Sequence, residues 1–182
     1  LPKMQSRLMP VATYMPVTEP LGENRSKALI PRNVAVGDTN FVLNYFRRSA
    51  DHRLLFGGGV SYTARMPASL PADMRRTMLS IFPQLADARQ DFTWGRNVSI
   101  TQDRAPHLRR VAPNLYFAQG FSGQGVAITA IAAKVVAEAI RGQAERFDLF
   151  AKIPHRPFPG GRYLRAPTLA LAMTWFRLRD RL

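Results

Sequence analysis

Apolar and polar residues alternate over short stretches in the first half of the chain, which predicts strands. Residues 9–19 have strand character but contain prolines, so we expect an edge strand or a bent one. The clearest hairpin pairs residues 41–48 with 53–56 across a turn-like linker. A further short strand is expected at residues 92–100, with an interruption at Gly95.

A helical spacing of apolar residues appears in three other segments. One helix is expected to begin after Ser69 as its cap and to stop at Pro83. Residues 126–140 are apolar or alanine almost all round, which predicts a largely buried helix ended by Gly142. A last helix is expected after Pro167.

Glycine and proline mark the segments between these elements. Residues 21–38 contain both and are predicted to cross as a loop. Three consecutive glycines, Gly57 to Gly59, follow the second strand of the hairpin. They form either a plain loop or a place where backbone approaches a ligand closely, and the sequence leaves both interpretations open.

The chain has 182 residues, 46% of them hydrophobic and 21% charged, which is typical of one globular domain with at most a small annex. There is no cysteine, which excludes disulfides, thiolate nucleophiles and thiolate-held iron–sulfur clusters. The three histidines lie far apart in the sequence. We therefore expect no metal site.

The formal net charge is +14, and most of it comes from arginines that are spread along the chain. Spread arginines favour solvated faces over a nucleic-acid site, so we expect no nucleic-acid partner. No apolar run is long enough for a transmembrane segment. The arginine-rich last helix either docks on its own protein or lies on a membrane surface.

The first residues, LPKMQSRLMP, show neither an initiator methionine nor a signal-peptide pattern. We therefore expect a cytoplasmic protein and a piece of a longer chain.

The most informative unit is a short apolar run, a glycine-rich turn and a helix. Residues 114–118 predict a buried strand, and residues 119–125 form the turn. Such a turn presents backbone N–H groups and the positive end of the helix dipole, which suits an anion or a developing negative charge. Ser122 could hydrogen-bond a ligand or cap the helix. The dinucleotide pattern G-x-G-x-x-G does not occur in the sequence.

The stretch NLYFAQGFSGQGV, residues 114–126, resembles the flavin-contacting C-terminal segment of the D-amino-acid-oxidase-like (DAO) superfamily of FAD-dependent oxidoreductases. Residues 101–106, TQDRAP, resemble the T-x-D-x-x-P element of that family. Residues 9–21, 44–59 and 145–161 are similar to its γ-glutamylputrescine-oxidase-like branch. The resemblance covers nearly the whole chain, and its motifs occur in the family's order.

This resemblance implies an α+β fold: a mixed, largely antiparallel sheet of a DAO-type substrate domain with flanking helices, plus the last strand and helix of a Rossmann-like FAD domain. Residues 1–110 are expected in the substrate domain and residues 111–142 in the FAD domain. Residues 143–182 would form a Pro/Gly-rich linker and a basic helix. The N-terminal half with G-x-G-x-x-G is then the missing partner, and an isolated half would expose apolar surface that favours a homo-oligomer.

The resemblance further implies a C-terminal fragment of an enzyme that uses FAD to oxidise an amine or amino-acid-like substrate, by hydride transfer to flavin N5. The isolated fragment is expected to be inactive, and no catalytic residue is assigned. The alternative is a folded remnant or a basic interaction module that does not bind FAD. The expected cofactor contacts are Gly120, Phe121, Ser122, Gly123, Gln124, Gly125 and Val126.

Other side chains are candidates for the substrate pocket. Tyr45 and Trp94 either line this pocket or belong to the core. Arg104 and Asp103 either orient substrate or flavin, or form a structural ion pair. Sarcosine-oxidase-type members have a carboxylate-binding lysine where Ala127 stands, so the resemblance favours a polyamine-like amine over an N-methyl amino acid.

The sequence departs from the family pattern at two further positions, neither of which concerns binding of a substrate carboxylate. Some members have histidine where Gln124 stands, and glutamine donates a hydrogen bond but carries no charge. Arg109 replaces a frequent glycine, which we interpret as a surface change.

Overall fold

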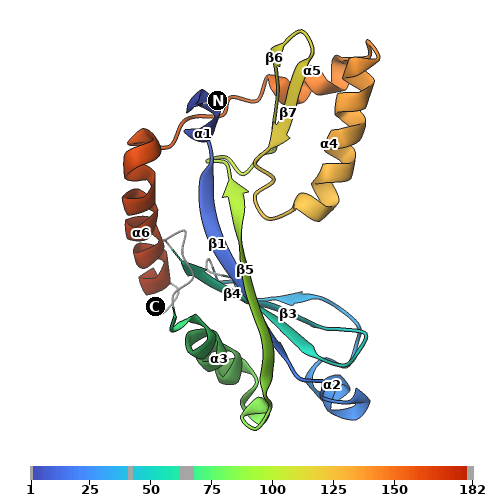
Figure 1. The fold of residues 1–182 in the computed structure, drawn as a ribbon, viewed down its shortest axis with the longest axis vertical. Helices are drawn as coiled ribbons and strands as arrows, with labels where there is room; N and C mark the ends of the chain where they lie inside the picture. The colour runs from blue at the N-terminus through green and yellow to red at the C-terminus, as the bar shows by residue number, and fades with distance from the viewer. Residues whose placement is uncertain (1, 41–42, 62–67, 180–182) are drawn as a thin grey trace. The chain divides into compact units, whose positions relative to one another are not determined.

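The computed structural model describes residues 2–40, 43–61 and 68–179. The chain divides into two compact units (Figure 1). The first comprises residues 1–11 and 97–168, and the second residues 12–96 and 169–182. These limits differ from the predicted segments, whose assignment to a substrate domain and an FAD domain stays a prediction.

A five-stranded sheet runs through the second unit in the order β2-β3-β4-β1-β5, as far as the described residues go. The pairs β1–β4, β2–β3 and β3–β4 are antiparallel, which confirms the predicted α+β class. The predicted hairpin is present with its first strand beginning at Tyr45, and residues 41–42 of that prediction lie outside the described residues. The hairpin register places Tyr45 opposite Gly57. The strands are β1 Met9–Thr18, β2 Val36–Gly37, β3 Tyr45–Arg48, β4 Leu54–Ser61 and β5 Gln90–Ile100.

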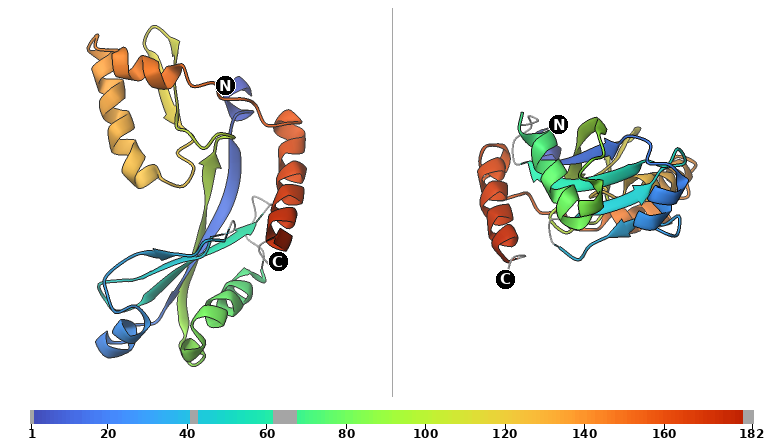
Figure 2. Two further views of the ribbon diagram at one scale, coloured as in Figure 1. Left: turned by 180° about the vertical axis from the view of Figure 1, so that it is seen from behind. Right: turned by 90° about the horizontal axis from the view of Figure 1, so that it is seen from below.

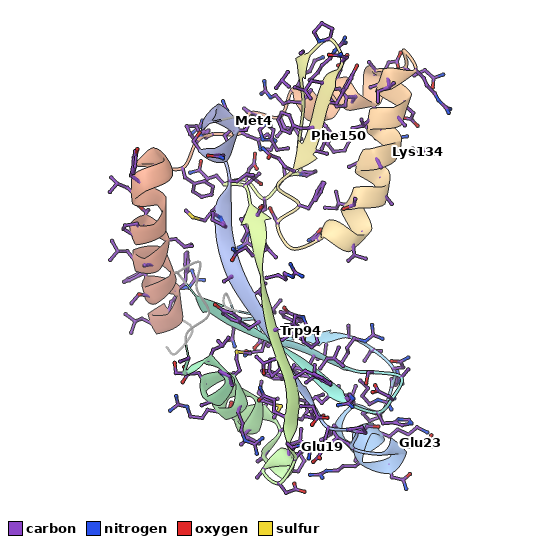
Figure 3. The ribbon with its side chains drawn as sticks, viewed as in Figure 1. Met4, Glu19, Glu23, Trp94, Lys134 and Phe150 are labelled. Atoms are coloured by element: carbon purple, nitrogen blue, oxygen red, sulfur yellow. The ribbon has the colours of Figure 1, made fainter. Side chains whose placement is uncertain are left out.

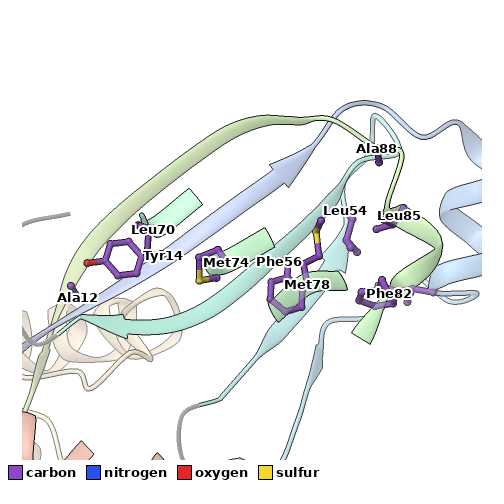
Figure 4. Close-up of a cluster of buried hydrophobic side chains, with 11 residues drawn as sticks. Ala12, Tyr14, Leu54, Phe56, Leu70, Met74, Met78, Phe82, Leu85 and Ala88 are labelled. Carbon is purple, nitrogen blue, oxygen red and sulfur yellow. The ribbon is translucent and has the colours of Figure 1, made fainter. Parts of the chain in front are cut away.

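The predicted helix after Ser69 is present as α3, Leu70–Ile81, and a short 3-10 helix, η1 Pro83–Leu85, follows it. Met74 and Met78 of α3 pack with Leu54 and Phe56 of β4 in the main hydrophobic core (Figure 4). Both β4 side chains are fully buried. The apolar stripe of α3 therefore covers the sheet as its spacing predicts.

A helix, α2 Glu23–Leu29, lies in the stretch predicted as a loop, so that prediction was wrong. Two turns hold too few apolar repeats to reveal a period. Contacts distant in sequence hold the helix instead, including the ion pair of Arg25 with Asp87. Gly22, with φ of 74°, makes the turn into the helix.

β1 lies between β4 and β5, so it is not an edge strand. The alternative, a bent strand, is correct, because a register shift falls between Thr13 and Tyr14. Gly95 does not interrupt β5. A Cβ at Gly95 would collide with the ring of Tyr14, so the glycine makes room for that ring within a continuous strand.

The three glycines after Phe56 are part of β4, so the plain-loop interpretation was wrong. A Cβ at Gly57 would collide with the ring of Tyr45, and one at Gly59 would lie 2.7 Å from the Met74 sulfur. The side chain of Tyr45, rather than a ligand, thus fills the space over Gly57. Glycine here permits close packing of an aromatic ring on backbone.

The first unit holds a two-stranded antiparallel sheet with helices beside it. Its small core includes Leu108, Val135 and Phe147. Gly142, with φ of 91°, follows the end of the long helix, as predicted. The elements are α1 Pro2–Gln5, β6 His107–Ala112, β7 Leu115–Gln119, α4 Gly125–Ile140 and α5 Glu145–Ala151.

The prediction that α4 and its preceding strand are largely buried was wrong for this chain. Val126 is fully exposed, and Ile131 and Ile140 are 55% and 64% exposed. Buried positions of α4 are Ala132, Val135 and Ala139, which share one face. The apolar surface of α4 is therefore larger than the part of it that other residues of this chain cover.

The last helix, α6 Gly161–Arg179, begins before Pro167 and contains it, so the predicted start after Pro167 was wrong. Figure 2 shows α6 as one continuous helix in both views. A proline inside a helix removes one backbone hydrogen bond but leaves the others, and the chain accepts that loss here. Among the described helices, none is both long and apolar enough to cross a membrane.

Candidate functional site

The glycine-rich loop between β7 and α4 depends on left-handed backbone at three positions. Gly120, Ser122 and Gly123 have φ of 71°, 52° and 92°. A Cβ at Gly120 would lie 2.5 Å from Thr101 Cγ2 and 3.1 Å from Leu8 Cδ2, so this glycine is packed tightly from behind. A Cβ at Gly123 would meet no described atom within 4 Å. The loop is therefore supported at its first glycine and open at its second.

The turn 101–106 supplies that support. The N–H of Ser122 donates to the carbonyl of Ser99 at 3.1 Å, and the N–H of Thr101 donates to Ser122 Oγ at 3.4 Å. Thr101 Oγ1 donates to the Ala105 carbonyl at 2.8 Å, which closes the turn. Two motifs separated in sequence, TQDRAP and GFSGQG, thus form one structure.

The start of α4 leaves backbone donors available. The first intrahelical bond runs from the N–H of Ile128 to the carbonyl of Gln124, at 3.0 Å. N–H groups in the first helical turn have no acceptor within the helix, and no side-chain cap is recorded for Gln124. Ser122 Oγ donates to the Gly120 carbonyl at 3.2 Å instead of capping the helix. The loop and helix start therefore present N–H groups and partial positive charge beside the open space at Gly123.

The family model for FAD dependent oxidoreductases (DAO) matches residues 1–139. The chain belongs to this family. It is 45% identical over 181 residues to the gamma-glutamylputrescine oxidoreductase of Escherichia coli (strain K12), covering 100% of this chain and 42% of that protein. It is 36% identical over 175 residues to a probable oxidoreductase OrdL of Haemophilus influenzae, covering 96% of this chain and 40% of that protein. The chain thus spans about two fifths of the length of these relatives, and the predicted family resemblance is confirmed.

Solved structures of two oxidases share the fold of this DAO-family chain. Glycine oxidase from Geobacillus kaustophilus matches with a TM-score of 0.64 and 19% identity, over 82% of this chain and 40% of that one. A thermally stable mutant of fructosyl peptide oxidase matches with a TM-score of 0.65 and 16% identity, over 92% of this chain and 44% of that one. At these identities the likeness supports the fold class.

The residues predicted to contact the cofactor lie in the DAO-family loop, except for Gly125 and Val126, which begin α4. The predicted substrate residues lie elsewhere. Tyr45 Oη and Thr13 Oγ1 are 2.9 Å apart within the sheet. Trp94, labelled in Figure 3, lies on β5 and is 46% exposed. Arg104 is exposed in the turn 101–106, with φ of 60°. A role of Tyr45, Trp94 and Arg104 in a substrate pocket stays a prediction.

The structure places a histidine beside Asp103, one of the two residues considered for a structural ion pair. Asp103 Oδ2 lies 3.2 Å from Nδ1 of His155, a residue the sequence analysis did not single out. Burial opposes ionisation of the Asp103 carboxyl, but the Ala105 N–H and His155 outweigh it and lower its pKa. His107 and His155 are both buried, with ring centroids 4.2 Å apart. Separation along the chain had hidden this contact, because sequence spacing reveals only local neighbours.

The described part of the chain contains no group of three or more His, Cys, Asp or Glu side chains that could hold a metal ion. Burial is the main cause that lowers the pKa of His107 to about 4, and His155, Arg109 and Arg7 add to it. Asp103 acts in the opposite direction. His107 is therefore neutral in the folded protein at neutral pH.

The low pKa of His107 predicts acid sensitivity. Its unfolded pKa is about 6.5, so the unfolded state binds more protons between pH 6.5 and 4. The free energy of unfolding should be highest above pH 6.5 and fall by about 3 kcal/mol as the pH drops to 4. Urea unfolding of the complete protein across this range measures it, and His107→Gln should flatten the profile.

His52→Asn is the matched control for that experiment. His52 lies in the hairpin turn at φ of 62°, a conformation that asparagine tolerates. A profile that His107→Gln flattens and His52→Asn does not would assign the acid sensitivity to the buried ring of His107. A His107→Gln profile as steep as that of the wild type would contradict the assignment to His107.

Proposed function

We propose that this chain is the C-terminal part of an FAD-dependent oxidoreductase that oxidises an amine or amino-acid-like substrate. The observation that carries the proposal is the glycine loop, which is braced by the turn 101–106 and opens beside Gly123 at the start of α4. A relative 45% identical is a gamma-glutamylputrescine oxidoreductase, which favours a polyamine-like amine. A cytoplasmic location goes with this proposal.

The residues of the loop fit the electron-rich edge of a flavin. When bound, FAD would accept a hydride from the carbon that bears the amine. The N–H groups at the start of α4 would stabilise negative charge on the flavin edge, because they carry the positive end of the helix dipole. Gly123 leaves the approach open, since no described atom occupies the space where its Cβ would be. Gln124 is exposed there and can donate a further hydrogen bond.

Substrate selection would depend on residues away from the loop. Ala127 offers no cation for a carboxylate, so the proposed substrate does not need one at that position. Tyr45, Trp94 and Arg104 are the proposed contacts on the substrate side. Their substitution should change KM for the amine more than the affinity for FAD.

The test begins with protein expressed from the complete natural gene. A flavoprotein should show absorption bands near ~370 and ~450 nm, because the cofactor alone absorbs there. A panel of amines with detection of peroxide then identifies the substrate class. Protein that stays colourless after incubation with FAD would contradict the proposal and favour the folded remnant or interaction module.

The partner we propose is the N-terminal half of the same enzyme. An apolar groove of about 390 Å³ runs along β7 and α4. Phe117, Phe121, Val136 and Ile140 are among the residues that line it. The relatives are more than twice as long as this chain, so a further part of such an enzyme would be available to cover this face.

A charge in this groove should prevent that association. When the chain and the rest of the gene product are co-expressed as two polypeptides, Ile140→Glu should lower the co-purified amount about tenfold, because a buried unpaired charge is costly. Leu149→Glu on α5 is the matched control, since Leu149 is 68% exposed and outside the groove. Equal co-purification of both variants would contradict the docking proposal.

The same variants test whether a second copy of this chain, instead of the N-terminal half, occupies the groove. Light scattering on the chain alone detects a homo-oligomer. A dimer that Ile140→Glu dissociates and Leu149→Glu preserves would assign the groove to a second copy.

A further inference from the structure

The segment after α5 contacts the turn that supports the glycine loop. His155 of this segment is 6% exposed, and its ring lies against that of His107, the first residue of β6, at an angle of 42°. Arg7 Nε donates to the His155 carbonyl at 2.9 Å, and the N–H of Phe158 donates to the Ser6 carbonyl at 2.8 Å. The segment is therefore held at His155 and again three residues after it.

His155 reaches the turn 101–106 through Asp103. Its Nδ1 lies 3.2 Å from Asp103 Oδ2, within ion-pair distance. Neither ring nitrogen of His155 meets the geometry of a hydrogen bond to a described residue, so the link between the two side chains is this close approach of polar atoms. The second carboxylate oxygen, Oδ1, accepts from the Ala105 N–H at 3.1 Å. Asp103 thus connects a buried side chain from the C-terminal segment to the backbone of the turn.

The turn 101–106 in turn contacts the glycine-rich loop through Thr101. Thr101 Oγ1 donates to the Ala105 carbonyl, and the Thr101 methyl group lies 2.5 Å from where a Cβ of Gly120 would be. The same threonine donates its N–H to Ser122. Each contact in the series joins neighbouring groups, from His155 through Asp103 and Thr101 to the loop.

We infer that His155 and Asp103 are positioning residues for the flavin-binding loop, so that the segment after α5 belongs to the support of the cofactor site. The inference rests on the proposed function. It requires no contact of either residue with flavin. A loop held in its binding geometry loses less freedom when the ligand arrives, so its support strengthens binding.

Titration of the apoprotein of the complete enzyme with FAD tests the inference. His155→Phe keeps a ring beside His107 but removes the nitrogen near Asp103, and it should weaken FAD binding about tenfold. Asp103→Asn should do the same, and the double variant should lose no more than either single one, because both changes break one connection. His155→Gln, which keeps a polar group, should fall between His155→Phe and wild type.

Other measurements distinguish positioning from general stability. The rate at saturating FAD and amine should stay close to wild type, while the visible circular dichroism of bound flavin should change. Ile153→Ala, in the same segment and half-buried, is the control and should bind FAD as wild type does. A purely structural role would lower the melting temperature of the apoprotein. It would leave the affinity for FAD unchanged at temperatures where the variant is fully folded.

The outcomes decide separately on the inference and on the proposed function. FAD affinity within about twofold of wild type in both His155→Phe and Asp103→Asn would overturn the inference, as would effects that multiply in the double variant. If His155→Phe does not fold, Asp103→Asn decides, because Asp103 lies in an exposed turn. A wild-type protein that binds no FAD would overturn the proposed function itself, and the inference with it.

Discussion

Replacing Gly120 with alanine should weaken FAD binding by the complete protein roughly a hundredfold. The backbone of Gly120 has φ of 71°, a conformation unfavourable for alanine. The new methyl group would also lie 2.5 Å from Thr101 Cγ2 and 3.1 Å from Leu8 Cδ2, so the loop must move. Movement would displace the N–H groups that we propose to meet the flavin edge. Fluorescence titration of the apoprotein with FAD measures the loss.

Gly142→Ala is the matched control for this prediction. Gly142 also has positive φ, 91°, but a Cβ there would meet no described atom within 4 Å, and it lies at the other end of α4. It should cost about 1 kcal/mol of stability and leave FAD binding unchanged. FAD binding by Gly120→Ala at the level of Gly142→Ala would contradict the role of the loop.

Replacing Phe56 with alanine should lower the free energy of unfolding by about 3–5 kcal/mol. The ring is fully buried between β4 and α3, and it stacks on Phe46 with centroids 5.9 Å apart. Its removal leaves a cavity that the surrounding strands cannot fill, so the loss exceeds the transfer term alone. Urea unfolding followed by tryptophan fluorescence reports the change.

An exposed ring provides the comparison. Phe92 on β5 is 55% exposed and contacts the guanidinium of Arg53 at 5.3 Å from the ring centroid. Phe92→Ala should cost about 1 kcal/mol or less. Similar losses for Phe56→Ala and Phe92→Ala would contradict the assignment of Phe56 to the core.

The elements that could be predicted from sequence carry their signal locally. The hairpin β3–β4 is marked by strand residues on both sides of a short turn. α3 shows its apolar stripe, and Gly142 marks the end of α4. The loop 120–125 was recognised because left-handed backbone at Gly120 and Gly123 requires glycine, which leaves a visible pattern.

The features that could not be predicted from the sequence depend on contacts between residues that are distant along the chain. α2 is too short to show a period, and Gly95 looks like an interruption until Tyr14 is found across it. The exposure of α4 was missed because an apolar composition predicts burial without saying which chain provides the cover. The contact of His155 with Asp103 joins segments distant in sequence, so no spacing rule could indicate it.

The limits between the two compact units have a practical consequence. They fall at residues 11/12, 96/97 and 168/169, inside the continuous strands β1 and β5 and inside the helix α6 rather than in loops. A protease that cleaves exposed loop tips would therefore not release either unit intact. A genetic truncation at these limits would sever two strands and leave unpaired backbone at the cut ends, which invites aggregation. Continuous strands therefore join the two units, even though each unit has its own core.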